Sequence, residues 1–271
     1  MNKQAATDAP RIIEGGRWTF SRAWRLVATG ISFSLFGLGG LIMALIWFPL
    51  INLFIRDKQK RARFARASVH RIWRIYIEIM RGLGVLTYEF EGAEKLRACR
   101  GTVVVANHPS LIDVVFLMGF MQHTRAVVKE GVWNNFFMSG VVRACNYIPN
   151  LGDPERLIED CSDALRDGAN LCIFPEGSRT PIEKRAKYQR GFAHVALQAD
   201  APVLLVAIEV TPPTLRKNEP WYSIPVKKPH WRIRVIDTIE TAGEHRYKRS
   251  VLGVRALTQN VQKRIEEELK F

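Results

Sequence analysis

A chain of 271 residues is long enough for one large domain, or for one domain and a membrane anchor. Apolar residues make up 47% of it, which excludes a disordered chain, and the four scattered cysteines form no metal-binding pattern. With 40 Lys and Arg against 26 Asp and Glu, the net charge is +14. An anionic partner is therefore expected: a nucleic acid, an acidic membrane surface or a phosphorylated substrate.

The first distinctive segment is apolar. No charged residue occurs over residues 27–55, and a membrane span needs only about 20 such residues. The run is too long for the core of a signal peptide, which has roughly 7–15 residues. Gly37, Gly39 and Gly40 interrupt its middle, and Pro49 lies near its end. Two arrangements stay open: a single span, or a hairpin in one leaflet with the glycines at the bend.

Basic residues flank this apolar run on both sides. Since Lys and Arg mark the cytoplasmic side of a membrane, a hairpin would have both ends in the cytoplasm. For a single span, the denser downstream cluster would place residues 56–271 there. Either way, we expect attachment to the cytoplasmic (inner) membrane with the active domain facing the cytoplasm. The flanking residues are Arg17, Arg22 and Arg25 before the run, then Arg56, Lys58, Lys60, Arg61, Arg63 and Arg66 after it.

Residues 64–83 carry aromatic and aliphatic side chains at close to helical spacing, with arginines interleaved. A basic amphipathic helix with aromatics is typical of the headgroup region of a membrane. The alternative is an ordinary helix packed on the globular domain, and both can hold in part. The pattern predicts an N-terminal membrane-attached helical unit over residues 1–84.

From residue 85 to residue 271, β-rich runs alternate with helical patterns. This order predicts an α/β class domain, layered, with a largely parallel sheet flanked by helices. Active sites in such sheets lie beyond the carboxyl ends of the strands. The expected strands are 85–92, 101–107, 124–130, 170–176, 202–210 and 231–237, and the expected helices are 110–122, 131–144, 154–168, 190–199 and about 250–270.

A His-x4-Asp motif follows the second expected strand. Pro109 suits the first position of a helix, which would leave His108 at the strand-to-helix turn and Asp113 in the first turns. The two side chains can meet only if His108 lies outside the regular helix and folds back over its start, because residues five apart on a helix point about 140° apart. A carboxylate on one imidazole nitrogen fixes the tautomer and makes the other nitrogen a general base. The alternative is a capping histidine and an aspartate favoured by the helix dipole.

The string Phe-Pro-Glu-Gly-Ser-Arg-Thr follows the strand expected at 170–176. Its prolines and glycine predict a tight loop that offers backbone N–H groups at Gly177, the Ser178 hydroxyl and an Arg179 fork suited to a phosphate. Glu176 would hold the loop or orient Arg179 by charge pairing. The alternative is a plain strand exit with solvated charges.

These two motifs together resemble those of the glycerolipid acyltransferase family, which includes the lysophosphatidic acid acyltransferases. The resemblance covers about residues 85–215. It implies that His108 and Asp113 form a catalytic dyad and that Glu176, Gly177, Ser178 and Arg179 belong to the acceptor-binding loop. It also implies acyl-CoA or acyl-carrier protein as the co-substrate, with no metal and no bound cofactor.

A middle block from residue 127 to residue 150 resembles the same family, with Lys129 near its start. That block commonly ends in an arginine associated with the acceptor phosphate, and Asn150 stands at the corresponding position here. Arg143 or Lys129 would then have to supply the charge. The departure leaves open a lysolipid other than 1-acylglycerol-3-phosphate, or an amino-acid lipid with a free hydroxyl.

The sequence thus predicts acyl transfer from a thioester to the hydroxyl of a lysophospholipid at an anionic membrane surface, with His108 as general base. Three alternatives compete with this function. One is a transacylase or lipase-like hydrolase, although no Gly-x-Ser-x-Gly elbow occurs. Another is a non-catalytic membrane-binding protein on the same scaffold. The last is a nucleic-acid binder, which we do not expect because much of the excess charge flanks the apolar run.

Overall fold

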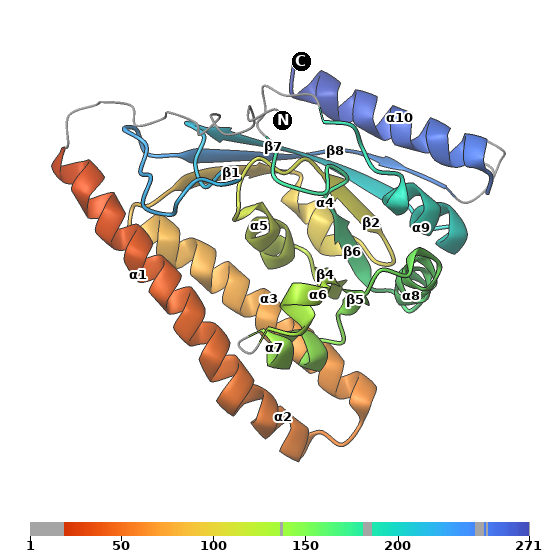
Figure 1. The fold of residues 1–271 in the computed structure, drawn as a ribbon, viewed down its shortest axis with the longest axis horizontal. Coiled ribbons are helices and arrows are strands. Elements are labelled where there is room, and N and C mark those ends of the chain that lie inside the picture. Colours follow the sequence, from red (N-terminus) through yellow and green to blue (C-terminus); the bar gives the residue numbers. More distant parts are fainter. Residues whose placement is uncertain (1–18, 136–137, 181–185, 242–246, 248, 271) are drawn as a thin grey trace, which may run out of the picture.

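The computed structural model describes residues 19–270 apart from 136–137, 181–185, 242–246 and 248 (Figure 1). Two long N-terminal helical elements lie beside a layered α/β unit, so the fold class expected from the sequence is confirmed.

The apolar run forms one continuous helix rather than a hairpin. α1 (Phe20–Ile42) passes through a π-helical turn (Met43–Trp47) into α2 (Phe48–Phe54), 35 residues in all. Gly37, Gly39 and Gly40 lie inside α1, so of the two arrangements left open the hairpin with its bend at the glycines is wrong. A single glycine weakens a helix by only about 1 kcal/mol, which does not force a break. Pro49 is accommodated beside the π-helical turn, the usual response to a missing N–H.

The chain reverses only after Ile55, and α3 (Lys58–Gly82) returns alongside α1 (Figure 1). The Asp57 carboxylate caps α3 by accepting from the Lys60 N–H at 2.7 Å. The structure confirms that residues 64–83 are helical and pack on the globular domain, and the location of this helix in the headgroup region stays a prediction. Ile77 and Met80 are buried against the globular core, whereas Ile75 on another side of α3 is 58% exposed.

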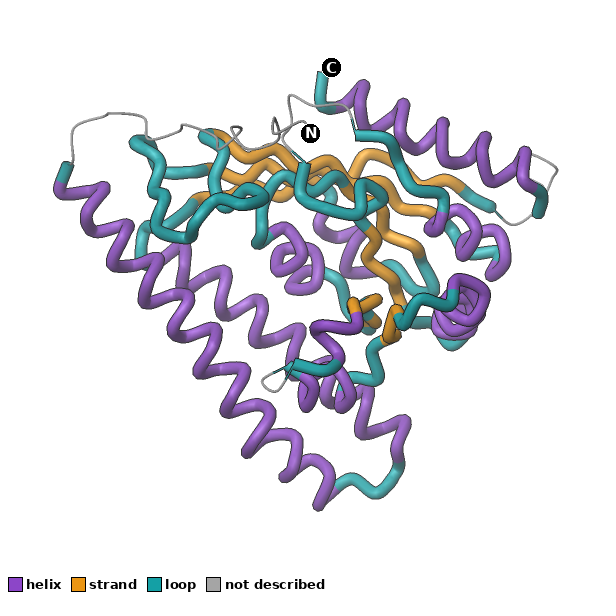
Figure 2. The backbone as a smooth tube through the Cα atoms, viewed as in Figure 1, coloured by secondary structure: helices purple, strands orange, loops and turns teal. Residues whose placement is uncertain are grey.

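One six-stranded sheet, ordered β1-β8-β7-β2-β6-β3, organises the rest of the chain (Figure 2). All neighbouring strands are parallel except β7 and β8, which pair antiparallel. The strands are β1 (Thr87–Glu91), β2 (Val103–Ala106), β3 (Thr124–Arg125), β6 (Asn170–Ile173), β7 (Val203–Thr211) and β8 (His230–Ile239).

The sheet has a separate apolar core on each face. The alternation of β2 shows this directly, because Val104 and Ala106 belong to one core and Val103 and Val105 to the other. Such a strand reads as continuously apolar because both its faces are covered. The helices are α3, α4 (Ala93–Ala98) and α5 (Asp113–Phe120) on the first face, and α8 (Pro154–Arg166), α9 (Gly191–Ala199) and α10 (Val251–Glu268) on the second.

The middle block departs from the sequence prediction. The strand expected at 124–130 is split between β3 of the main sheet and β4 (Val127–Lys129), which pairs in parallel with β5 (Ile148–Asn150) in a second small sheet. The single helix expected at 131–144 is two short ones, α6 (Glu130–Trp133) and α7 (Ser139–Ala144). Asn134 ends the first of them, and the Asn135 side chain accepts from the Met138 N–H in the turn between them, as asparagine commonly does outside helices.

Candidate active site

The turn between β2 and α5 is held by side-chain hydrogen bonds to a neighbouring strand and loop. The Asn107 side chain donates to the Ile208 carbonyl and accepts from the Ile208 N–H, both at 2.7 Å. α5 begins at Asp113, so the helix start expected at Pro109 is wrong. The reason is that the Asp113 carboxylate reaches back to the Ser110 N–H at 2.6 Å, which closes a turn ahead of the helix.

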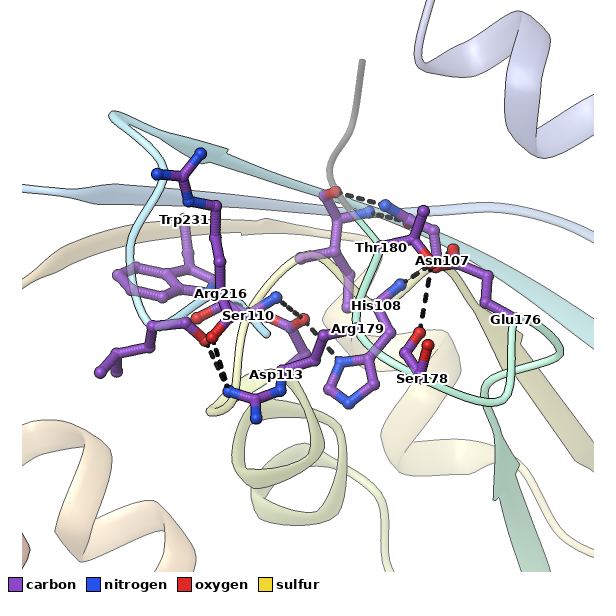
Figure 3. A network of polar contacts seen from close by, with 12 residues as sticks. Asn107, His108, Ser110, Asp113, Glu176, Ser178, Arg179, Thr180, Arg216 and Trp231 are labelled. Atoms are coloured by element: carbon purple, nitrogen blue, oxygen red, sulfur yellow. Dashed lines mark hydrogen bonds and ion pairs between the residues drawn. The ribbon is translucent and has the colours of Figure 1, made fainter. Parts of the chain in front are cut away.

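His108 and Asp113 meet as the spacing of their motif requires (Figure 3). The Nδ1 atom of His108 lies 3.0 Å from Oδ2 of Asp113. The carboxylate is fully buried, while the imidazole keeps 16% of its side-chain surface exposed. In the part of the chain that the structure describes, Nε2 of the ring forms no hydrogen bond. One ring nitrogen is therefore fixed and the other is free to exchange a proton with a bound molecule.

Burial raises the pKa of Asp113, and hydrogen bonding to His108, Ser110 and Trp231 opposes that shift by stabilising the charged form. The indole Nε1 of Trp231, on β8, donates to Oδ1 of Asp113 at 3.0 Å. The sequence gives no indication of this contact. A buried tryptophan N–H needs an acceptor, but the pattern of an isolated strand does not say which acceptor.

The loop after β6 encloses His108 from several directions. The Phe174 ring stacks on the imidazole, with centroids 4.1 Å apart and planes 21° apart. Oε1 of Glu176 accepts from the His108 N–H at 3.2 Å, and the His108 carbonyl accepts from the Thr180 N–H at 3.0 Å. Gly177 adopts φ +72°, a conformation that favours glycine. The two motifs are therefore one structural unit, as expected.

Glu176 was expected either to hold the loop or to orient Arg179 by charge pairing. The structure shows no ion pair between Glu176 and Arg179, and Glu176 holds the loop against the His108 N–H. The Nη1 group of Arg179 donates instead to the carbonyls of Leu215 (2.9 Å) and Arg216 (3.1 Å). The Leu215 carbonyl also accepts from the Leu111 N–H at 3.1 Å. The segment after β7 that contains Leu215 and Arg216 thus connects the two motifs by hydrogen bonds. No feature of the sequence indicates this connection.

The remaining predicted residues lie elsewhere. Lys129 is exposed at the end of β4, opposite Asn150 in the register of the small sheet. Arg143 is exposed on α7, with its guanidinium 5.6 Å from the centre of the Trp133 ring. Within the described residues, neither cation forms a hydrogen bond or ion pair with His108 or its neighbours. The structure therefore brings together six of the eight predicted site residues.

Comparison with known proteins finds acyltransferases. A family model described as "Acyltransferase" matches residues 87–209. A 1-acyl-sn-glycerol-3-phosphate acyltransferase from Cocos nucifera is 23% identical over 78% of this chain, and one from Pseudomonas aeruginosa is 28% identical over 60% of it. The chain spans 67% and 65% of the lengths of these relatives.

Among solved structures, the fold is similar to that of the 1-acyl-sn-glycerophosphate acyltransferase PlsC from Thermotoga maritima. The TM-score is 0.69 at 20% identity, over 93% of this chain and 98% of the other. Similarity over nearly the whole length of both chains includes the N-terminal helices as well as the α/β unit.

The fold, the motif geometry and the matched domain define the class: an O-acyltransferase. The acyltransferase domain matched at residues 87–209 and the curated relatives, which are named as acyltransferases of 1-acyl-sn-glycerol-3-phosphate, support the resemblance to the glycerolipid acyltransferase family. The apolar N-terminal helix over Phe20–Phe54 fits membrane association.

Proposed function

We propose that this protein transfers a fatty acyl group from acyl-CoA or acyl-carrier protein to the hydroxyl of a lysophospholipid, with 1-acylglycerol-3-phosphate as the first acceptor to test. The observation that carries the proposal is the hydrogen bonding of the two nitrogens of the His108 ring. Its Nδ1 is fixed by a buried carboxylate and its Nε2 is free of protein partners among the described residues. An imidazole held in this way is suited to general base catalysis.

In the proposed reaction, Nε2 of His108 removes the proton of the acceptor hydroxyl as its oxygen attacks the thioester carbonyl. A C–O bond forms, the C–S bond breaks, and the proton passes from the imidazolium to the departing thiolate. Asp113 stabilises the imidazolium in between. No acyl-enzyme is needed, and the chemistry requires neither a metal nor a bound cofactor.

The acceptor is recognised, in this proposal, by the loop that carries Glu176, Gly177, Ser178 and Arg179. Among the described residues, Arg179 donates to protein carbonyls through Nη1 alone, so its other N–H groups are the ones that we propose for a phosphate oxygen. Lys129 is the further cation that we propose for the acceptor charge, whereas Arg143, the other cation expected from the sequence, lies on α7 beside the Trp133 ring. Asn150 favours testing other lysolipids and a hydroxyl-bearing amino-acid lipid beside the default acceptor.

We further propose that the α/β unit faces the cytoplasm at an anionic membrane, because basic residues flank the apolar helix. Nucleic acid is not a partner in this proposal.

The direct test offers the purified full-length protein a panel of lyso-acceptors with acyl-CoA and with acyl-carrier protein. Acyl transfer releases one free thiol for each new lipid ester, so both products are measured. Thiol release without a new ester would indicate thioester hydrolysis instead. Fatty acid release from intact phospholipid would indicate a lipase-like hydrolase.

A further inference from the structure

A pocket lies at the opposite edge of the sheet from His108. It has a volume of about 870 Å³ and is bounded by α2, the first turns of α3, α7 and the segments that enter β2, β3 and β6. His108 follows the carboxyl end of β2, whereas Arg100 precedes its amino end. The pocket therefore does not belong to the site described above.

Seven of the residues that line this pocket are Lys or Arg. α3 contributes four of them, Lys58, Arg61, Arg63 and Arg66. One acidic residue among the described lining residues, Asp167, faces them.

Three further cations come from other elements: Arg100 from the approach to β2, Arg125 from β3 and Arg143 from α7. Within the described part of the chain, none of the seven has a carboxylate within ion-pair distance, whereas arginines elsewhere, such as Arg166 and Arg264, do. Seven cations gathered around one lining carboxylate repel one another, and an anion bound among them reduces that repulsion.

Among these cations, Arg66 has a buried N–H group that lacks a hydrogen-bond acceptor in the part of the chain that the structure describes. Its Nη1 donates to the Cys145 carbonyl at 3.0 Å, but its Nε is buried and has no hydrogen-bond partner among the described residues. A buried donor without an acceptor is unfavourable and indicates a missing partner. His123 also lines the pocket. Burial lowers the pKa of its imidazole, and the positive charges of Arg100 and Arg66 lower it further, as expected in a positive electrostatic potential.

α2 indicates what kind of anion binds. Phe48 and Asn52 line the pocket, while Leu53 and Phe54 on the same helix are 73% and 78% exposed. An apolar surface directly beside a cationic pocket matches a molecule with an anionic head and apolar tails. A nucleotide would leave this apolar surface uncovered.

We infer that this pocket binds the phosphate headgroup of an anionic membrane phospholipid whose acyl chains lie against the exposed face of α2. The bound lipid holds the end of the helical pair and the amino edge of the sheet at the headgroup layer. It is a structural lipid, distinct from the acceptor that is acylated.

The test measures the binding of dioctanoyl phosphatidylglycerol to the full-length protein in detergent, by the shift in thermal unfolding midpoint across a titration. Dioctanoyl phosphatidylcholine, CoA and inorganic phosphate are the comparison ligands. We expect phosphatidylglycerol to stabilise the protein more than any of these. In a variant with Lys58→Gln, Arg63→Gln and Arg100→Gln, its affinity falls about 10- to 100-fold, since each cation removed weakens the attraction to the anionic headgroup.

The matched control removes three positive charges outside the pocket: Arg56→Gln, Arg71→Gln and Arg255→Gln, all exposed side chains. We expect its affinity to stay within about twofold of the wild type. Equal losses in both variants would overturn the inference in favour of diffuse electrostatics. Stronger binding of CoA, or equal binding of phosphatidylcholine or phosphate, would overturn the lipid assignment.

His108→Ala is expected to bind the lipid as the wild type does, because His108 does not line the pocket. A failed reaction mechanism therefore leaves this inference standing, and a failed lipid site leaves the mechanism standing.

Discussion

The indole of Trp231 and the carboxylate of Asp113 are joined by a 3.0 Å hydrogen bond, although 118 positions separate them in the chain. Asp113 also accepts from the Ser110 N–H and contacts the His108 ring through its other oxygen. A buried carboxylate held through both oxygens has no freedom to turn away from the imidazole. Trp231 is therefore a positioning residue for the proposed dyad, acting through Asp113.

Replacing Trp231 with Phe keeps an aromatic ring in the core and removes the donor. We expect a loss of about 1.5–3 kcal/mol in the free energy of unfolding, because a hydrogen bond to a charged group is lost. The pKa of Asp113, already raised by burial, should rise further, and the acidic limb of the pH–rate profile should move to higher pH. Turnover should fall with little change in KM.

Trp221→Phe is the matched control for this substitution, because Trp221 is 43% exposed on the loop before β8. It should change neither the stability nor the pH profile measurably. A Trp231→Phe enzyme with an unshifted profile would remove Trp231 from the positioning role, whatever its stability.

Gly177→Ala should impair the loop that encloses His108. The φ of +72° costs an alanine about 1–2 kcal/mol, and its Cβ would meet the Gln189 carboxamide, which must move. Gly152→Ala is the control, since Gly152 has φ +91° with no atom within 4 Å of an added Cβ. Both variants should lose similar stability. Acyl transfer should fall in Gly177→Ala alone, and an equal effect on both would contradict the role of the loop.

The pH dependence of stability should report on Glu176. Burial raises the pKa of Glu176, so the folded state favours the protonated carboxyl. The resulting stabilisation is fully present below the pKa of the unfolded chain and is lost as the pH rises through the higher folded pKa. Glu176→Gln keeps an acceptor for the His108 N–H and does not titrate.

Thermal unfolding midpoints of the wild type and Glu176→Gln, measured from about pH 4 to about pH 8, therefore give the contribution of this group by difference. We expect the variant to gain stability relative to the wild type as the pH rises. The shift at Asp113 has the same direction and is present in both proteins, so it cancels. A difference that is flat or of opposite sign would contradict the raised pKa.

The sequence predicts the elements and the two motifs well because local patterns determine them. Continuous apolar runs such as Val103–Ala106 indicate buried strands, and the spacing of His108 and Asp113 already demands a turn ahead of the helix. All six expected strands lie in observed strands or overlap them.

What could not be predicted depends on contacts between distant segments. The start of α5 is moved from Pro109 to Asp113 by a carboxylate that bonds backward. The contact of Trp231 with Asp113 and the carbonyl of Leu215 that receives Arg179 arise only when the strands assemble. The glycines of the apolar helix do not bend it, because the helical hydrogen bonds of α1 continue through them.

The turnover of His108→Ala tests the central claim most directly. The full-length variant is purified in detergent, shown to be folded by its unfolding midpoint, and assayed with an acyl thioester and 1-acylglycerol-3-phosphate for coupled release of thiol and formation of ester. Loss of the general base predicts a turnover about 10²- to 10⁴-fold below the wild type, with the fold intact. A folded His108→Ala protein that turns over at close to the wild-type rate would contradict the account.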